Sequence, residues 1–83
     1  MSRARDVVET ITRALVDRPE QVRVQEHDHK GTGIIVVEVA SDDLGRVIGR
    51  QGRTAAAIRT LAAVTAEAEG HRVKVDILEP DER

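Results

Sequence analysis

The pattern of hydrophobic and polar residues predicts a helix over Arg3 to Asp17. Its apolar residues recur at i, i+1, i+4, i+7 and i+8, which is the spacing of one helix face, while arginines and a glutamate occupy the other. Pro19 follows, and the residue before a proline is disfavoured in the helical region. The predicted apolar face consists of Val7, Val8, Ile11, Ala14 and Leu15.

Three segments have the pattern of β-strands. Val22 to Glu26 alternates valine with polar residues, which indicates a half-exposed strand. Ile34 to Val39 is a dense run of mostly β-branched residues and is predicted as the central strand. His27 to Gly33, between them, has the composition of a hairpin loop. The last strand is predicted at Val73 to Leu78, where valine and isoleucine again alternate with charged residues.

A short helix is predicted after the central strand. Ser41 is a suitable N-cap, and Asp42 and Asp43 would lie in the first turn, where the helix dipole favours acidic side chains. Gly45 and Gly49 interrupt this helix and keep it short.

An alanine-rich helix is predicted from about Arg53 to Ala68. Gly70 would end it, since glycine is the usual residue just beyond a helix C-terminus. The residues at helical spacing that predict its apolar face are Ile58, Leu61, Ala62 and Thr65.

The element order is therefore helix, strand, strand, helix, helix, strand, which indicates an α+β fold. The first two strands form a hairpin and are antiparallel, while the helix pair crosses over between the second and third strands, which makes those two parallel. We expect a three-stranded mixed sheet with three helices on one face, in one domain over residues 1–83, with 79–83 a loose tail.

Composition limits how this fold is stabilised and what it does. The 83 residues include no Phe, Tyr, Trp or Cys, so valine, isoleucine, leucine and alanine must form the core, without disulfides. We expect modest stability or added burial through self-association. The charged N-terminus does not resemble a signal peptide and no apolar run is long enough to cross a membrane, so we expect a soluble, cytoplasmic protein.

The segment Gly45 to Arg53 carries the candidate chemistry. Gly49 and Gly52 lie three residues apart between two helices, in a loop whose backbone a ligand can approach closely. The loop leads into a helix N-terminus, which attracts anions. Four arginines lie in or near it, with no acidic residue from Arg46 to Arg59, although the net charge of the chain is −2. This local positive charge indicates a phosphate-binding site.

The sequence Val47-Ile48-Gly49-Arg50-Gln51-Gly52 resembles the signature of KH domains, hydrophobic-Ile-Gly-x-x-Gly. The element order is similar to the prokaryotic type II KH arrangement. In length and motif the chain resembles the small bacterial single-KH RNA-binding proteins, the KhpA-type family, and only the C-terminal tail lies outside the resemblance.

The resemblance implies that single-stranded RNA is held through its backbone by the GXXG loop. Arg50 and Gln51 would meet phosphates, and Arg53 would add charge at the helix start. Val47, Ile48 and Ala55 would form the floor of an apolar groove for the bases, with Leu44 and Ile58 packed beneath. The RNA-binding residues implied are Arg46, Val47, Ile48, Gly49, Arg50, Gln51, Gly52, Arg53 and Ala55.

One position departs from many KH motifs. Ala55, three residues after the second glycine, stands where the family often has isoleucine. The groove should therefore be shallow, and no aromatic residue is present to stack on the bases. We expect weak binding with modest sequence preference.

Other kinds of site receive less support. His27 and His29 lie in the predicted hairpin loop without a well-placed third ligand, so we predict a solvated loop and no metal site. The glycine spacing is not that of a mononucleotide or dinucleotide site. No nucleophile–base arrangement is apparent, so we predict neither an enzyme nor a cofactor nor a small-molecule substrate.

Two functional hypotheses follow. The first is a non-enzymatic protein that binds single-stranded RNA and acts as a post-transcriptional regulator or RNA chaperone. The second is an assembly module that pairs with itself or with a larger KH-containing partner, a type of pairing that the resemblance implies. Ile34, Val36 and Leu78 on the outer face of the sheet are either scattered surface residues or part of a partner surface.

Overall fold

The computed structural model describes residues 2–79, so all of the predicted tail except Glu79 lies outside the described residues. The helices are α1 (Arg3–Leu15), α2 (Leu44–Ile48) and α3 (Arg53–Ala68), and the strands are β1 (Arg23–His29), β2 (Thr32–Glu38) and β3 (Arg72–Ile77). Three short 3₁₀ segments complete the chain: η1 (Pro19–Gln21), η2 (Ser41–Asp43) and η3 (Arg50–Gly52).

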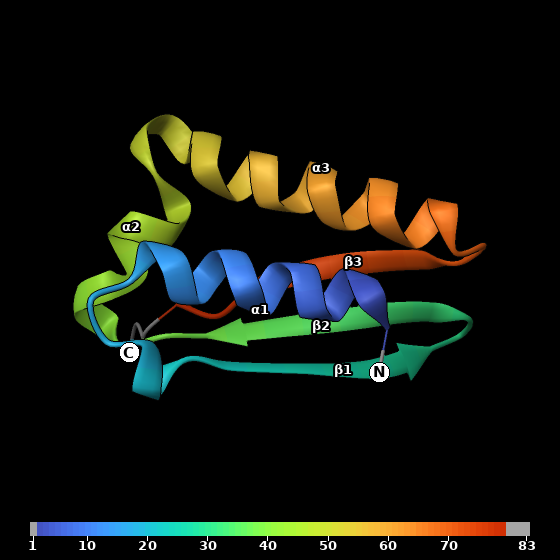
Figure 1. Cartoon of the computed structure of the whole chain (residues 1–83), viewed down its shortest axis with the longest axis horizontal. Coiled ribbons are helices and arrows are strands. Elements are labelled where there is room, and N and C mark those ends of the chain that lie inside the picture. Colours follow the sequence, from blue (N-terminus) through green and yellow to red (C-terminus); the bar gives the residue numbers. More distant parts are fainter. Residues whose placement is uncertain (1, 80–83) are drawn as a thin grey trace.

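The architecture confirms the predicted α+β fold. The sheet has the order β1-β2-β3, with β1 antiparallel and β3 parallel to β2. The helices lie over one face of this sheet, with α1 beside α3 and α2 at one end of the molecule (Figure 1). A crossover through two helices is what allows β3 to run parallel to β2.

The core between the helices and the sheet is aliphatic. Each element contributes small or β-branched side chains, and their close packing replaces the large aromatic residues that the chain lacks. The most deeply buried hydrophobic side chains, each at most 2% exposed, are Ala4, Val8, Ile35, Val37, Val47, Ile58, Ala62 and Ala66. Within residues 2–79, none of the helices has the length and apolar character needed to cross a membrane.

The prediction of a long hairpin loop is wrong. β1 continues to His29, and only Lys30 and Gly31 connect it to β2, both with positive φ (53° and 87°). Two consecutive residues with positive φ match a type I′ turn, whose twist suits a tight hairpin. Composition favoured a loop here because His27 and Asp28 are polar, but they lie in an exposed edge strand that needs no apolar face.

The predicted apolar faces of the two long helices need correction. In α1 the buried residues are Ala4, Val8 and Thr12, whereas Ala14 is exposed. In α3, Leu61 is 47% exposed. Helix α3 packs through Ala55, Ile58, Ala62 and Ala66, because alanines let it approach α1 and the sheet closely. The periodic pattern gave more weight to large residues than to these small ones.

Candidate functional site

The two glycines of the candidate loop occupy backbone conformations that few other residues adopt. Helix α2 ends at Ile48, and Gly49 follows with φ 77° and ψ 168°. Gln51 and Gly52 then both have left-handed backbone angles, with φ 57° and 74°. The chain then enters the N-terminus of the 16-residue helix α3, where the helix dipole favours an anion.

Gly49 is required for its small size as well as for its backbone angles. A Cβ atom at this position would lie 2.3 Å from the Oγ1 atom and 2.9 Å from the backbone nitrogen of Thr54. The positive φ would also strain any side chain there. The first turn of α3 therefore packs directly against the backbone of Gly49, which fixes the shape of the loop.

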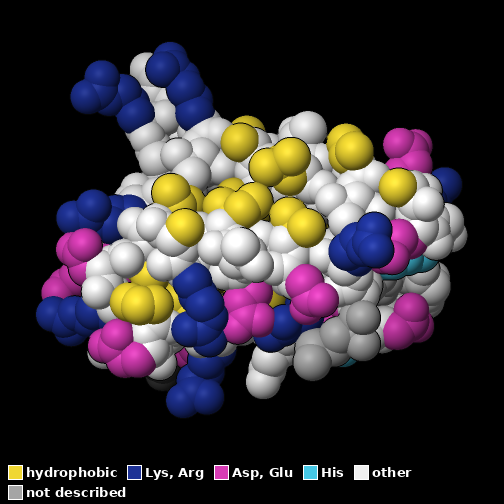
Figure 2. Space-filling model, viewed as in Figure 1, with side chains coloured by type: hydrophobic (Ala, Val, Ile, Leu, Met, Phe, Trp, Pro, Cys, Tyr) yellow, Lys and Arg dark blue, Asp and Glu magenta, His cyan; other side chains and the backbone are white. Residues whose placement is uncertain are grey.

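Two of the arginines expected at the site extend from the loop into solvent. Arg50 and Arg53 are exposed, and Nη2 of Arg53 donates a hydrogen bond to Oε1 of Gln51 at 2.7 Å. Basic side chains project from the end of the molecule where α2 meets α3 (Figure 2). Their charge is therefore available to a ligand that approaches the loop.

Arg46, predicted from the sequence to bind RNA, instead forms ion pairs within the protein. Its Nη2 atom lies 3.1 Å from Oδ2 of Asp17, and its Nε atom lies 3.7 Å from Oδ1 of Asp43. These two carboxylates already compensate the guanidinium charge. Arg46 therefore ties α2 to the segment after α1, and it contributes less free positive charge to the loop than Arg50 or Arg53.

The predicted groove floor also needs correction. Val47 and Ala55 are 0% and 3% exposed, so both side chains are part of the core and are not available to a ligand at the surface. Ile48 is partly exposed beside the loop, and so is Leu44, which was expected beneath the floor. Ile58 is buried, as predicted. The sequence does not distinguish buried from exposed hydrophobic residues on either side of a GXXG loop. Which of them are buried depends on how α2 packs on α3.

Asp43 is a buried carboxylate next to the site whose role the sequence prediction missed. It is 1% exposed, and its two carboxylate oxygens accept hydrogen bonds from the backbone amides of Asp17 at 3.1 Å and Arg18 at 3.0 Å. The expected role of Ser41 as an N-cap is wrong, since Ser41 lies inside η2, whose N-cap is Ala40. Asp43 lies at the N-cap position of α2, but its carboxylate makes no capping bond to that helix. No sequence signal separates Asp43 from the exposed Asp42, because the difference depends on which side of η2 faces the α1–η1 connection.

Comparison with known proteins places this fold and loop in a family. The profile of the KhpA/KhpB KH domain matches residues 5–77. A protein named RNA-binding protein KhpA in Halalkalibacterium halodurans is 47% identical over 73 residues, which cover 88% of this chain and 96% of that protein. Proteins of the same name in Caldanaerobacter subterraneus subsp. tengcongensis and Leifsonia xyli subsp. xyli are 50% and 48% identical, covering 88% and 83% of this chain and 97% and 88% of their own lengths. No solved structure matches the chain.

Proposed function

This chain belongs to the KhpA/KhpB KH-domain family, and we propose that it binds single-stranded RNA through the loop from Gly49 to Gly52 without catalysing a reaction. The Gly49–Gly52 backbone and the charges of Arg50 and Arg53 would hold the phosphates, as in other GXXG loops. The relatives' name supports RNA as the ligand. We infer the role of a post-transcriptional regulator or RNA chaperone acting in the cytoplasm.

The distribution of ion pairs is the observation that carries this proposal. Among residues 2–79, five arginines have a carboxylate within 4.0 Å: Arg3, Arg5, Arg13, Arg18 and Arg46. The same set of ion pairs includes neither Arg50 nor Arg53. Half of the ten arginines among residues 2–79 are thus compensated, and of the five that are not, Arg50 and Arg53 lie at the glycine loop. An acidic chain with two such arginines at a glycine loop has a local site for a polyanion.

The same geometry supports modest sequence preference. Recognition of RNA bases usually relies on aromatic or arginine stacking and on hydrogen bonds to base edges. The chain has no aromatic residue, and two of the three expected floor side chains are buried. Contacts to the backbone would therefore supply most of the affinity, and the affinity should depend strongly on salt.

A second candidate function, assembly with another KH protein, also has a specific observation in its favour. Leu61 and Val64 on α3 are 47% and 58% exposed, and they lie three residues apart on one helix face. Hydrophobic side chains gather on the exposed side of α3 (Figure 2). This surface would suit a second copy of the chain or a larger KH-containing partner, and it leaves the Gly49–Gly52 loop free.

The test is RNA binding by a variant with reversed charge in the loop. We expect Arg50→Asp/Gln51→Asp to lower the affinity for a fluorescein-labelled oligouridine of about eight nucleotides by at least roughly tenfold, because it replaces one phosphate contact with two repulsive charges. Fluorescence anisotropy at about 50 mM and about 200 mM salt measures this loss and its salt dependence.

The matched control is Arg23→Asp/Gln25→Asp, which makes the same change of residues at two exposed positions of β1. It should bind RNA much more tightly than the loop variant, and circular dichroism should show both variants folded. Equal affinities for the two variants would contradict the proposed site. If RNA binding survives in the loop variant, assembly becomes the better-supported function.

A further inference from the structure

Arg59 lies on α3, beyond the glycine loop, and its side chain crosses the cleft between α3 and β3. Its Nε atom donates a hydrogen bond to the carbonyl oxygen of Val75 at 3.3 Å. Within residues 2–79, β3 pairs with β2 alone, so the other edge of β3 is unpaired and the carbonyl of Val75 faces the cleft. Arg59 therefore covers an otherwise open backbone acceptor.

Arg59 lies on the part of α3 that continues from the loop. It follows Arg53 by six residues, which corresponds to about 9 Å along a helix axis. The chain has no acidic residue from Leu44 to Ala66. A strand held at the Gly49–Gly52 loop and running along α3 would therefore meet Arg59 before it met a negative charge.

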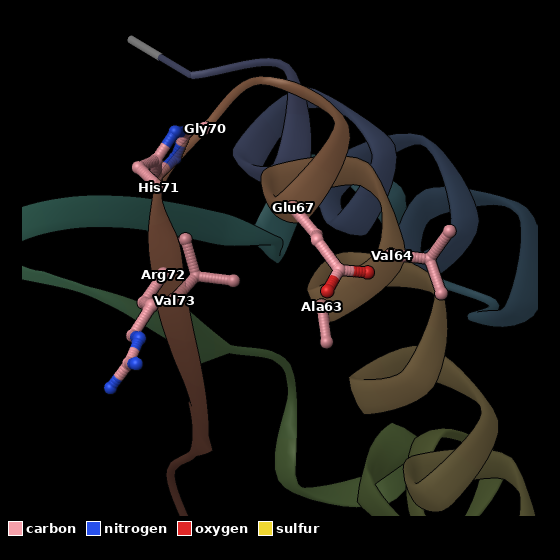
Figure 3. A pocket seen from close by; sticks show the side chains of 7 residues that line it. All are labelled: Ala63, Val64, Glu67, Gly70, His71, Arg72 and Val73. Atoms are coloured by element: carbon pink, nitrogen blue, oxygen red, sulfur yellow. The ribbon is translucent and has the colours of Figure 1, made fainter.

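Beyond Arg59 the cleft opens into a pocket of about 500 Å³. Ala63, Val64 and Glu67 of α3 line one side of it, and Arg72 and Val73 of β3 line the other (Figure 3). Arg59, Ala63 and Glu67 are spaced by four residues and so follow one stripe of the helix. Along this stripe the charge therefore changes from positive at Arg59 to negative at Glu67, so on the α3 side of the cleft Arg59 is the residue that would attract a phosphate.

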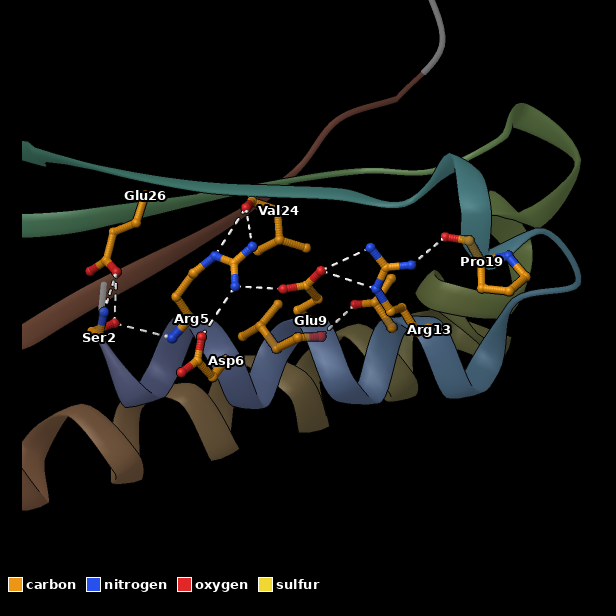
Figure 4. A network of polar contacts seen from close by, with 10 residues as sticks. Ser2, Arg5, Asp6, Glu9, Arg13, Pro19, Val24 and Glu26 are labelled. Atoms are coloured by element: carbon orange, nitrogen blue, oxygen red, sulfur yellow. Dashed lines mark hydrogen bonds and ion pairs between the residues drawn. The ribbon is translucent and has the colours of Figure 1, made fainter.

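A second arginine provides the comparison that shows how loosely Arg59 is held. Arg5 of α1 caps the opposite edge of the sheet, donating from Nε and Nη2 to the carbonyl of Val24 at 3.0 and 2.7 Å (Figure 4). Its Nη1 atom also pairs with Asp6 and Glu9, and its side chain is only 12% exposed.

Arg59, in contrast, makes a single longer bond to a neutral oxygen, is exposed, and is in none of the ion pairs among residues 2–79. A guanidinium bonds more strongly to an ionised oxygen than to a neutral carbonyl. A phosphate within reach would therefore draw Arg59 away from Val75, whereas Arg5 already has its carboxylates.

We propose that Arg59 is an additional RNA contact, which releases the carbonyl of Val75 and binds a phosphate of the strand that the Gly49–Gly52 loop holds. The proposal rests on the proposed function and extends it along α3. It makes three arginines, Arg50, Arg53 and Arg59, the phosphate contacts of the site. It also explains why the bond between α3 and the edge of β3 is made by an exposed arginine without a carboxylate partner.

The test compares Arg59→Ala, Arg59→Lys and Arg23→Ala in the oligouridine anisotropy assay. Arg59→Ala should weaken binding by roughly fivefold and reduce the slope of log K against log salt by about 0.7, the value for one phosphate contact on a single strand. Arg59→Lys retains the charge and should keep most of that slope. Arg23→Ala removes an exposed arginine of β1 and serves as the control for a general change in charge.

Each outcome distinguishes this inference from the proposed function. The inference is overturned if Arg59→Ala binds like Arg23→Ala while the loop variant Arg50→Asp/Gln51→Asp loses binding. It is also overturned if Arg59→Ala and Arg59→Lys are equally weak with an unchanged salt slope, since Arg59 would then only cap β3. If the loop variant binds normally as well, the proposed function itself fails.

Discussion

At the scale of single residues, Gly49 and Asp43 hold the loop from the two ends of α2. Gly49 lets the first turn of α3 pack against the backbone, while Asp43 binds the backbone amides of Asp17 and Arg18 from a buried position. The position of α2 thus depends on one residue without a side chain and one buried charge. The need for glycine could be predicted from the motif, but the burial of Asp43 could not.

Removing the Asp43 carboxylate should destabilise the fold. Asp43→Ala leaves two backbone amides without their acceptor, and we expect the free energy of unfolding to fall by about 1–3 kcal/mol. Asp42→Ala is the matched control, because the Asp42 side chain is 76% exposed and, within residues 2–79, forms an ion pair with Arg18 alone, at 3.5 Å. The control should change stability by less than about 0.5 kcal/mol, as measured by urea unfolding. Equal effects of the two variants would contradict a stabilising role for the hydrogen bonds that the buried Asp43 carboxylate accepts.

At the scale of elements, regular segments were predicted better than their faces. Helix α3 begins at Arg53 and ends at Ala68, as predicted, because Gly52 and Gly70 flank it. Its buried face was predicted wrongly, because α3 packs closely against α1 through its alanines and leaves Leu61 exposed. The pairing of the strands was correct, since the connection lengths allow few alternatives.

Glu9 pairs within α1 with Arg5 and Arg13, the two arginines that contact β1 and the η1 segment. The pKa of Glu9 lies below its usual range, chiefly because Arg13 donates a hydrogen bond to its carboxylate and with a further contribution from Arg5; partial burial opposes the shift. Arg13 in turn donates to the carbonyl of Pro19 at 2.7 Å. A carboxylate with a lowered pKa in the folded state stabilises the fold above its usual pKa, about 4.3, and this contribution is lost as pH falls through the lower folded value.

We therefore expect Glu9→Gln to be less stable than the parent protein near pH 7, with the difference becoming smaller as the pH is lowered to about 3. Thermal unfolding followed by circular dichroism at the two pH values measures this change. The control is Glu20→Gln, at an exposed position that is in none of the ion pairs among residues 2–79. A stability difference for Glu9→Gln that does not change with pH would contradict the role of its charge.

At the scale of the whole molecule, the loop and the exposed face of α3 offer two separate surfaces. The loop has free positive charge at one end of the molecule, whereas Leu61 and Val64 form an uncharged surface along the helix. Burial of this hydrophobic surface in a self-association interface would add stability to a protein whose aliphatic core is small. RNA binding and self-association would then be compatible, because they use different residues.

The measurement that tests the account most directly is a titration of ¹⁵N-labelled protein with oligouridine, followed by two-dimensional NMR of the backbone amides and the arginine Nε–H groups. The account predicts that the largest shifts occur from Gly49 to Arg53 and at the Nε–H of Arg59, with little change at Leu61, Val64 or the outer face of β1. Shifts confined to the face of Leu61 and Val64, or no shifts at the loop while RNA is bound, would contradict it.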